Sequence, residues 1–245
     1  KILVHDGEIT IGASGTLANK NQTGWFCATN FQLLYLGAAT QEEIKAALAA
    51  KAENAKALVA AMHFGVDKAA ANDSIAEYTT SGELVKLNAA IKLAKTSEAK
   101  YEEINAEGKT IPTVAVAVTD GTYGEATEIA KSAYDNTLAY INNGSYNKVD
   151  SVINILKAYV NNYVPVYNTA DEALKALTSA SAKEVLTSVM TEQKKALTSS
   201  LQSEDYVKAA IVQLTAATAT ANAQEAYEKN PNATDYTGFI INAKS

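Results

Sequence analysis

The sequence contains no arginine, and all 21 of its basic residues are lysines. Proteins favour arginine for two-pronged hydrogen bonding to carboxylates and phosphates and for recognising guanine in the major groove. Its absence disfavours nucleic-acid binding and phosphoryl transfer assisted by an arginine. The net charge of −6 points the same way, because an acidic protein repels the phosphate backbone. A genome biased toward lysine codons would leave the same signature, which weakens the inference without reversing it.

Cysteine and histidine are also scarce. Cys27 is the single cysteine, so no internal disulfide can form, which suits a cytosolic protein and equally a bacterial or phage surface protein. The two histidines, His5 and His63, have no second histidine or cysteine at a metal-ligand spacing. We therefore expect neither a zinc site nor a cofactor. His63 follows Met62 at the predicted end of a helix, where it can meet the last carbonyls.

Long apolar runs and nucleotide-binding loops are missing as well. No apolar run reaches the length of about eighteen residues that a membrane-spanning helix needs, so we expect none. Neither glycine-rich phosphate-binding motif occurs, and no EF-hand loop is present, although a looser surface calcium site stays open. The sequence opens on Lys1 rather than methionine, which we interpret as a processed product or a trimmed chain.

Alanine dominates what is present. Apolar residues make up 47% of the chain, and many of them are alanine, the best helix former. Apolar stripes at helical spacing predict about seven helices. Four Ser/Thr-x-x-Glu capping boxes mark expected helix starts, at Thr40, Thr80, Thr169 and Ser181. Ser203 is expected to cap a last long helix that ends near Lys229, before Asn230-Pro231.

Three segments show β-type patterns instead. Lys1–Val4 and Glu8–Ile11 flank an Asp-Gly turn, residues 111–118 alternate Val with Ala, and residues 237–242 are apolar and β-branched. We therefore predict an α+β fold, predominantly helical, with the helices packed beside a small sheet formed from the terminal strands and residues 111–118. The expected organisation is a β-rich segment 1–38, a helical segment 39–108 and a mixed segment 109–245, all in one compact domain.

Tyrosines crowd one stretch of the chain, together with several asparagines. Tyrosine suits interfaces because it offers a large contact area with a polar tip, so this stretch is a candidate surface for a carbohydrate or a neighbouring subunit. Ordinary packing in the core and boundary of two helices is the alternative. The candidate interface residues are Tyr134, Tyr140, Tyr146, Tyr159, Tyr163 and Tyr167.

A second candidate lies between the predicted strand and the next helix. Asp120, Gly121 and Thr122 stand there, where backbone N–H groups can hold an anion and an aspartate can accept a phosphoryl group. The second acidic residue and supporting motif that such chemistry needs are missing. A capped turn is the simpler interpretation of these residues.

The composition favours a non-enzymatic structural or interaction protein, exported or at a cell surface, that self-assembles into a layer, shell or filament. Its partner is then another copy of itself or another surface protein. The alternative is a monomeric extracellular module that binds a glycan or peptide through the tyrosine- and asparagine-rich surface. A third hypothesis, an enzyme centred near Asp120, requires a concave pocket with perturbed carboxylates.

Overall fold

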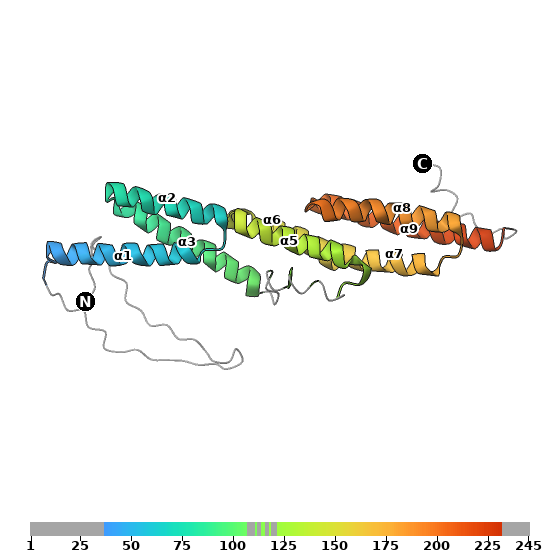
Figure 1. The fold of residues 1–245 in the computed structure, drawn as a ribbon, viewed down its shortest axis with the longest axis horizontal. Coiled ribbons are helices and arrows are strands. Elements are labelled where there is room, and N and C mark those ends of the chain that lie inside the picture. The colour runs from blue at the N-terminus through green and yellow to red at the C-terminus, as the bar shows by residue number, and fades with distance from the viewer. Residues whose placement is uncertain (1–36, 107–110, 112–113, 116–117, 119–121, 232–245) are drawn as a thin grey trace, which may run out of the picture. The chain divides into compact units, whose positions relative to one another are not determined.

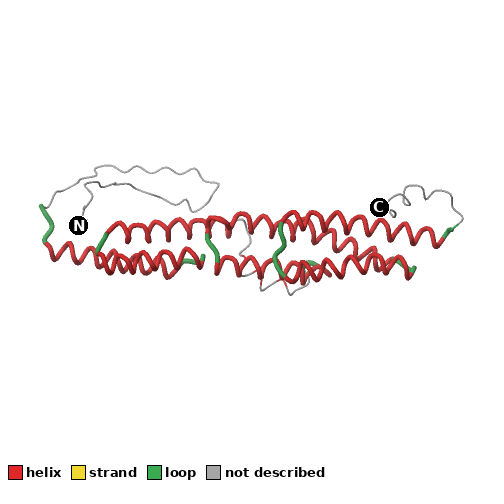
Figure 2. The backbone as a smooth tube through the Cα atoms, turned by 90° about the horizontal axis from the view of Figure 1, so that it is seen from above, coloured by secondary structure: helices red, strands yellow, loops and turns green. Residues whose placement is uncertain are grey.

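The computed structural model describes residues 37–106, 111, 114–115, 118 and 122–231, and every regular element among them is helical (Figure 1, Figure 2). The α-helices are α1 (Gln41–Ala61), α2 (Gly65–Ser81), α3 (Leu84–Ala106), α5 (Thr127–Asn143), α6 (Val149–Lys157), α7 (Val164–Ala176), α8 (Ala180–Ser199) and α9 (Glu204–Lys229). Three shorter helical turns complete them: η2 (Gly124–Ala126), η3 (Tyr146–Lys148) and η4 (Ala158–Tyr163).

The chain divides into two compact units, Lys1–Ala57 and Leu58–Ser245. In the first unit, the described residues form the start of α1. The capping box predicted there is confirmed: the amide of Thr40 donates to Glu43 Oε2 at 2.9 Å, and the amide of Glu43 donates to Thr40 Oγ1 at 3.2 Å. These two bonds satisfy backbone donors that have no partner inside the helix.

The second unit begins with a helical hairpin of α2 and α3, which lie side by side (Figure 1). Gly82 forms the turn in the left-handed region, with φ +70, and its amide donates to the carbonyl of Tyr78. The buried positions of α3 are three, four or seven residues apart and so form one face toward its neighbours. They are Leu87, Ala90, Ala94, Ser97 and Ile104.

α6, η4 and α7 form one uninterrupted helical run from Val149 to Ala176. η4 is a π-helical turn: the amide of Val164 donates to the carbonyl of Tyr159, five residues earlier. The wider turn directly precedes Pro165, which has no N–H to donate and sits in the first turn of α7. The chain therefore passes the proline without a break.

α8 and α9 form the last hairpin, and both pack on α7. Ser179 caps α8 by accepting from the amide of Ala182, and Ser203 caps α9 by accepting from the amide of Tyr206. The predicted cap at Ser203 and the predicted end at Lys229 are thus confirmed. The predicted cap of α8 at Ser181 is wrong by two residues, because Ser181 already lies inside the helix.

One hydrophobic cluster runs through the second unit from Phe64 near its start to Ala221 on α9, without a member on α2 among the described residues. Many of its members are alanines, which let helix backbones approach closely and leave few large side chains to fill space. The large, fully buried members of the cluster include Phe64, Tyr159 and Tyr163.

The predicted α+β fold is wrong for the described residues, which contain no strand. Ile111, Val114 and Ala115 are helical, and the buried positions Ile111, Ala115 and Val118 are spaced by four and three residues. That spacing is the period of a helix face, whereas the alternation of Val with Ala imitated the period of a strand. The two terminal strands of the prediction, in residues 1–36 and 237–242, lie outside the described residues.

Candidate functional site

Four of the six candidate tyrosines pack inside the chain. Tyr134, Tyr159, Tyr163 and Tyr167 are at most 6% exposed and belong to the hydrophobic cluster. The contacts that the structure gives them are those of core residues, which is the alternative raised from the sequence.

The buried tyrosine hydroxyls hold helices together. Tyr163 donates to Gln193 Oε1 on α8 at 2.8 Å, and Gln193 Nε2 donates to the carbonyl of Ala210 on α9 at 3.0 Å. Tyr159 accepts from the amide of Gln202, between α8 and α9, at 2.9 Å. Burial raises the pKa of Tyr159 to about 12, against a smaller opposing effect of the Gln202 amide, and burial also raises the pKa of Tyr163. Both hydroxyls therefore stay protonated at neutral pH.

Tyr140 and Tyr146 remain partly exposed at the end of α5. Tyr140 donates to the carbonyl of Ser145 at 3.2 Å, which fixes its ring across the turn. Gly144 lies under that ring, and an added Cβ there would come within 2.7 Å of the Tyr140 Cζ atom. Asn143 is exposed beside them. These residues are the part of the predicted tyrosine surface that a partner can reach.

Of the predicted anion site, Asp120 and Gly121 lie outside the described residues, and Thr122 stands in an exposed turn. The turn that follows is anchored from α7. Asn168 Oδ1 accepts from the amide of Ala126 at 3.2 Å, and Asn168 Nδ2 donates to the carbonyl of Tyr123 at 2.9 Å. The described part of this region is thus a turn held by the Asn168 side chain of α7.

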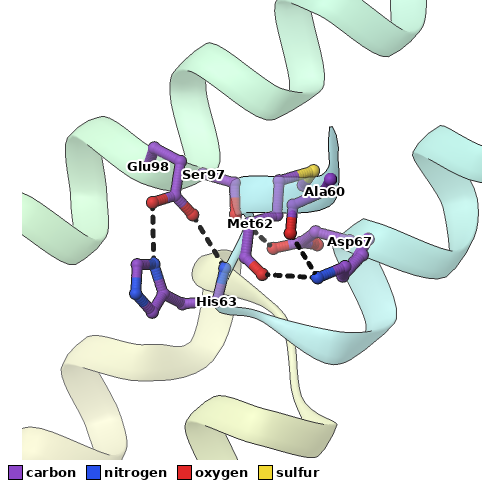
Figure 3. A network of polar contacts seen from close by, with 7 residues as sticks. Ala60, Met62, His63, Asp67, Ser97 and Glu98 are labelled. Carbon is purple, nitrogen blue, oxygen red and sulfur yellow. Dashed lines mark hydrogen bonds and ion pairs between the residues drawn. The ribbon is translucent and has the colours of Figure 1, made fainter. Parts of the chain in front are cut away.

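A well-connected polar side chain among the described residues is Asp67, which the sequence analysis did not single out. Asp67 lies in the first turn of α2 and is 4% exposed. Its carboxylate accepts from Ser145 Oγ at 2.6 Å, from the amide of Tyr146 at 2.8 Å and from Ser97 Oγ at 3.2 Å. These bonds join α2 to α3 and to the turn between α5 and η3. Figure 3 shows the hydrogen bond between Ser97 and Asp67.

Close backbone contacts and an ion pair also join α2 and α3 to the helices that follow. Gly65 lies against the end of α5 so closely that an added Cβ would overlap the carbonyl oxygen of Asn142. The amide of Val66 donates to the carbonyl of Gly144 at 2.9 Å. Lys100 on α3 reaches Asp150 on α6 at 2.7 Å. The hairpin of α2 and α3 is therefore attached to the following helices by several independent polar contacts.

His63 occupies the link between α1 and α2, next to this junction (Figure 3). Its Nδ1 lies 2.7 Å from Glu98 Oε2, and its amide donates to Glu98 Oε1 at 2.8 Å. Its ring stacks on Tyr101 with centroids 3.6 Å apart and an angle of 7°. His63 was expected to meet the last carbonyls of a helix. Lys68 does so instead, donating to the carbonyls of Ala60 and Met62.

A third polar cluster ties α9 to the link between α7 and α8. Glu225 accepts from the amides of Thr178 and Ser179, from the Thr178 hydroxyl, and pairs with Lys229 at 2.7 Å. Lys229, the Thr178 hydroxyl and the Ser179 amide lower the pKa of Glu225 to about 2. Glu228 accepts from Ser181 in the same region. The carboxylate of Glu225 acts as a cap for two amides that the helix ends leave free.

These clusters share one property: each of them joins elements that are far apart in the sequence. A carboxylate with all its partners inside the chain can position helices, but it has little capacity left for a substrate. The His63–Glu98 pair is the arrangement closest to acid–base chemistry, because the carboxylate fixes one ring nitrogen. No group of three or more potential metal ligands occurs in the described part of the chain.

No family model matches this chain, and no curated protein or solved structure is similar to it. Within the described ranges, no helix has both the length and the apolar content needed to cross a membrane.

Proposed function

We propose that the protein is a non-enzymatic structural subunit, exported or at a cell surface, that associates with further copies of itself into a layer, shell or filament. The arginine-free, alanine-rich, acidic composition supports an exported assembly protein. The proposal assigns no cofactor.

The proposal rests on buried polar side chains that form hydrogen bonds between separate elements, which we call polar ties. Asp67, Gln193 and Glu225 are each at most 7% exposed, and each binds elements separated by many residues in the sequence. Ties of this kind fix how helices sit on one another, since breaking one leaves a buried donor or acceptor without a partner. A subunit that repeats in an assembly needs such a fixed shape.

The test is the mass in solution, measured by light scattering after size exclusion at two concentrations at least tenfold apart. The full chain and a chain lacking residues 1–12 are compared. We expect species well above the monomer mass of 25.9 kDa in the full chain, growing with concentration. A monomer at both concentrations refutes self-association.

A monomer would instead favour the second candidate, a module that binds a glycan or peptide. The specific observation behind it is the partly exposed pair Tyr140 and Tyr146 beside exposed Asn143, with the Tyr140 ring held by its bond to Ser145. A fixed aromatic ring next to an amide is a common way to contact a sugar or a peptide.

A further inference from the structure

One asparagine of the sequence is followed directly by glycine, and it is the last residue of α5. This residue, Asn143, is exposed, and Gly144 continues the chain in an extended conformation with φ −108. An Asn-Gly pair can form a cyclic imide, because glycine has no Cβ to keep its backbone nitrogen away from the asparagine side chain. In the middle of a helix this reaction is suppressed, since the attacking amide already donates to a carbonyl four residues earlier.

The backbone amide of Gly144 is not held in this way. At the ends of α2, α7 and α9, the first amide after the helix donates back to a carbonyl of the last turn; these amides belong to Gly82, Leu177 and Asn230. The Gly144 amide donates no hydrogen bond to any of the described residues. Gly144 is also partly exposed, so solvent can remove the amide proton.

The side chain of Asn143 lies at the surface. Its Nδ2 donates to the carbonyl of Ala139 at 2.9 Å, and this bond is exposed to water. The reaction requires the side chain to leave this bond and turn toward the Gly144 nitrogen, which costs little because an exposed hydrogen bond is readily exchanged for one to water. Asn142 differs, because it precedes asparagine rather than glycine and the amide after it belongs to a helical residue.

The glycine itself has a structural reason to be there. An added Cβ at position 144 would lie 2.6 Å from the carbonyl oxygen of Tyr140 and 2.7 Å from its ring, so the turn accepts no side chain. The packing of Tyr140 on the turn therefore requires glycine after Asn143, and the reactive pair is a consequence of the fold.

We propose that Asn143 is a modification site, at which the chain deamidates through a cyclic imide with water as the only co-reactant. Solvent base removes the proton of the Gly144 amide, and the nitrogen forms a bond to the side-chain carbon Cγ while Nδ2 takes up a proton and leaves as ammonia. Water then opens the imide, and no atom is oxidised or reduced. Attack at Cγ gives aspartate, whereas attack at the main-chain carbonyl gives isoaspartate, in which the backbone runs through the side chain and gains one methylene group.

Isoaspartate at this position lengthens the chain where α2 meets the end of α5. The Gly144 carbonyl accepts from the Val66 amide at 2.9 Å, and the amide of Tyr146 donates to Asp67 at 2.8 Å. An extra methylene group shifts these donors and acceptors against one another, so the modification weakens the contact between α2 and the turn after α5. This proposal does not depend on the proposed function.

The test is ageing of the full chain in neutral buffer, well below its unfolding temperature. Asn143→Gln is the matched control, because glutamine keeps the amide but has to close a larger and less favourable ring. Peptide mass spectrometry quantifies deamidation at Asn143 and at Asn142, and electron-based fragmentation distinguishes isoaspartate from aspartate. Asn143→Asp carries the new charge without the extra methylene group. Circular dichroism records the thermal unfolding of fresh and aged samples.

We expect Asn143 to deamidate at least about tenfold faster than Asn142, because the amide after Asn142 is released only when the end of the helix opens. The aged chain should unfold about 2–4 °C below the fresh chain, the shift for losing about one net hydrogen bond in a unit of this size. Asn143→Gln should keep its Tm on ageing, and Asn143→Asp should stay close to the fresh native chain.

An intact Asn143, or equal rates at Asn143 and Asn142, would overturn the assignment of the site. Conversion to isoaspartate without a change in Tm would overturn its effect on the contact between α2 and the turn. An equal fall of Tm in aged Asn143→Gln would overturn that effect as well, because the loss would then arise elsewhere in the chain.

Discussion

Asp67 gives the sharpest test of how the second unit is held together. Asp67→Ala removes the acceptor of three hydrogen bonds, from Ser97, Ser145 and the amide of Tyr146, at a position that is 4% exposed. Hydrogen bonds to charged groups contribute about 1.5–3 kcal/mol each, and an orphaned buried donor costs about 1–3 kcal/mol. These losses are not additive, because the partners form one network.

We therefore expect Asp67→Ala to lower the free energy of unfolding by about 3 kcal/mol, at the upper end of ordinary single substitutions. For a unit of this size, that loss corresponds to a fall in Tm of about 6–12 °C. The assay is thermal and urea unfolding followed by circular dichroism. Asp73→Ala, also on α2 but exposed, is the control and should stay within about 0.5 kcal/mol of the native chain.

Asp67→Asn separates the charge from the shape, because the amide keeps one acceptor but turns an NH₂ group toward the donors. Its loss should lie between those of the control and Asp67→Ala. If Asp67→Ala and Asp73→Ala unfold at the same temperature, the hydrogen bonds of Asp67 do not stabilise the contact of α2 with α3 and with the turn after α5. Buried polar ties then do not hold these helices together.

The remaining predictions probe other ties. Because the pKa of Glu225 is lowered to about 2 in the folded chain, its stabilising effect is present above the unfolded pKa near 4.5 and is lost as pH falls toward 2; Glu225→Gln should flatten the acid side of a plot of Tm against pH. Gly65→Ala should destabilise the chain by more than 2 kcal/mol in urea unfolding, on the order expected for overpacking, because its Cβ overlaps the Asn142 carbonyl and both sides are backbone. Tyr163→Phe should cost about 1–3 kcal/mol in the same assay, since it leaves the buried oxygen of Gln193 without its donor; no loss would mean that Gln193 finds another partner.

Helix starts that depend only on neighbouring residues could be predicted from the sequence. Thr40 and Ser203 cap their helices as expected, because the bonds they make reach just three residues along the chain. Thr169 has the same Ser/Thr-x-x-Glu spacing, yet it lies within α7 and its hydroxyl donates back to the carbonyl of Pro165. The motif alone therefore cannot distinguish a helix start from a helix interior.

Features that depend on distant residues could not be predicted. The N-cap of α8 is Ser179 rather than Ser181, and Glu225, forty-six residues later, accepts from the Ser179 amide at that position. A proline normally ends or kinks a regular helix, but the π-helical turn before Pro165 removes that conflict, and the sequence does not show where such a turn forms. The tyrosine cluster was noticed in the sequence, yet whether its members face the core depends on helix packing, which composition does not determine.

The buried polar ties also explain how alanine-rich helices keep a fixed register against one another. Alanine-rich helix faces resemble one another from turn to turn, so sliding one helix along another by a turn changes the apolar contacts little. A buried polar pair is different, because after such a slide Gln193 no longer meets Tyr163 and Ala210, and Glu225 no longer meets the amides of Thr178 and Ser179. Each slide then leaves buried groups unsatisfied, at about 1–3 kcal/mol apiece. In this chain, we infer that small apolar residues supply the close packing while a few buried polar residues select the register.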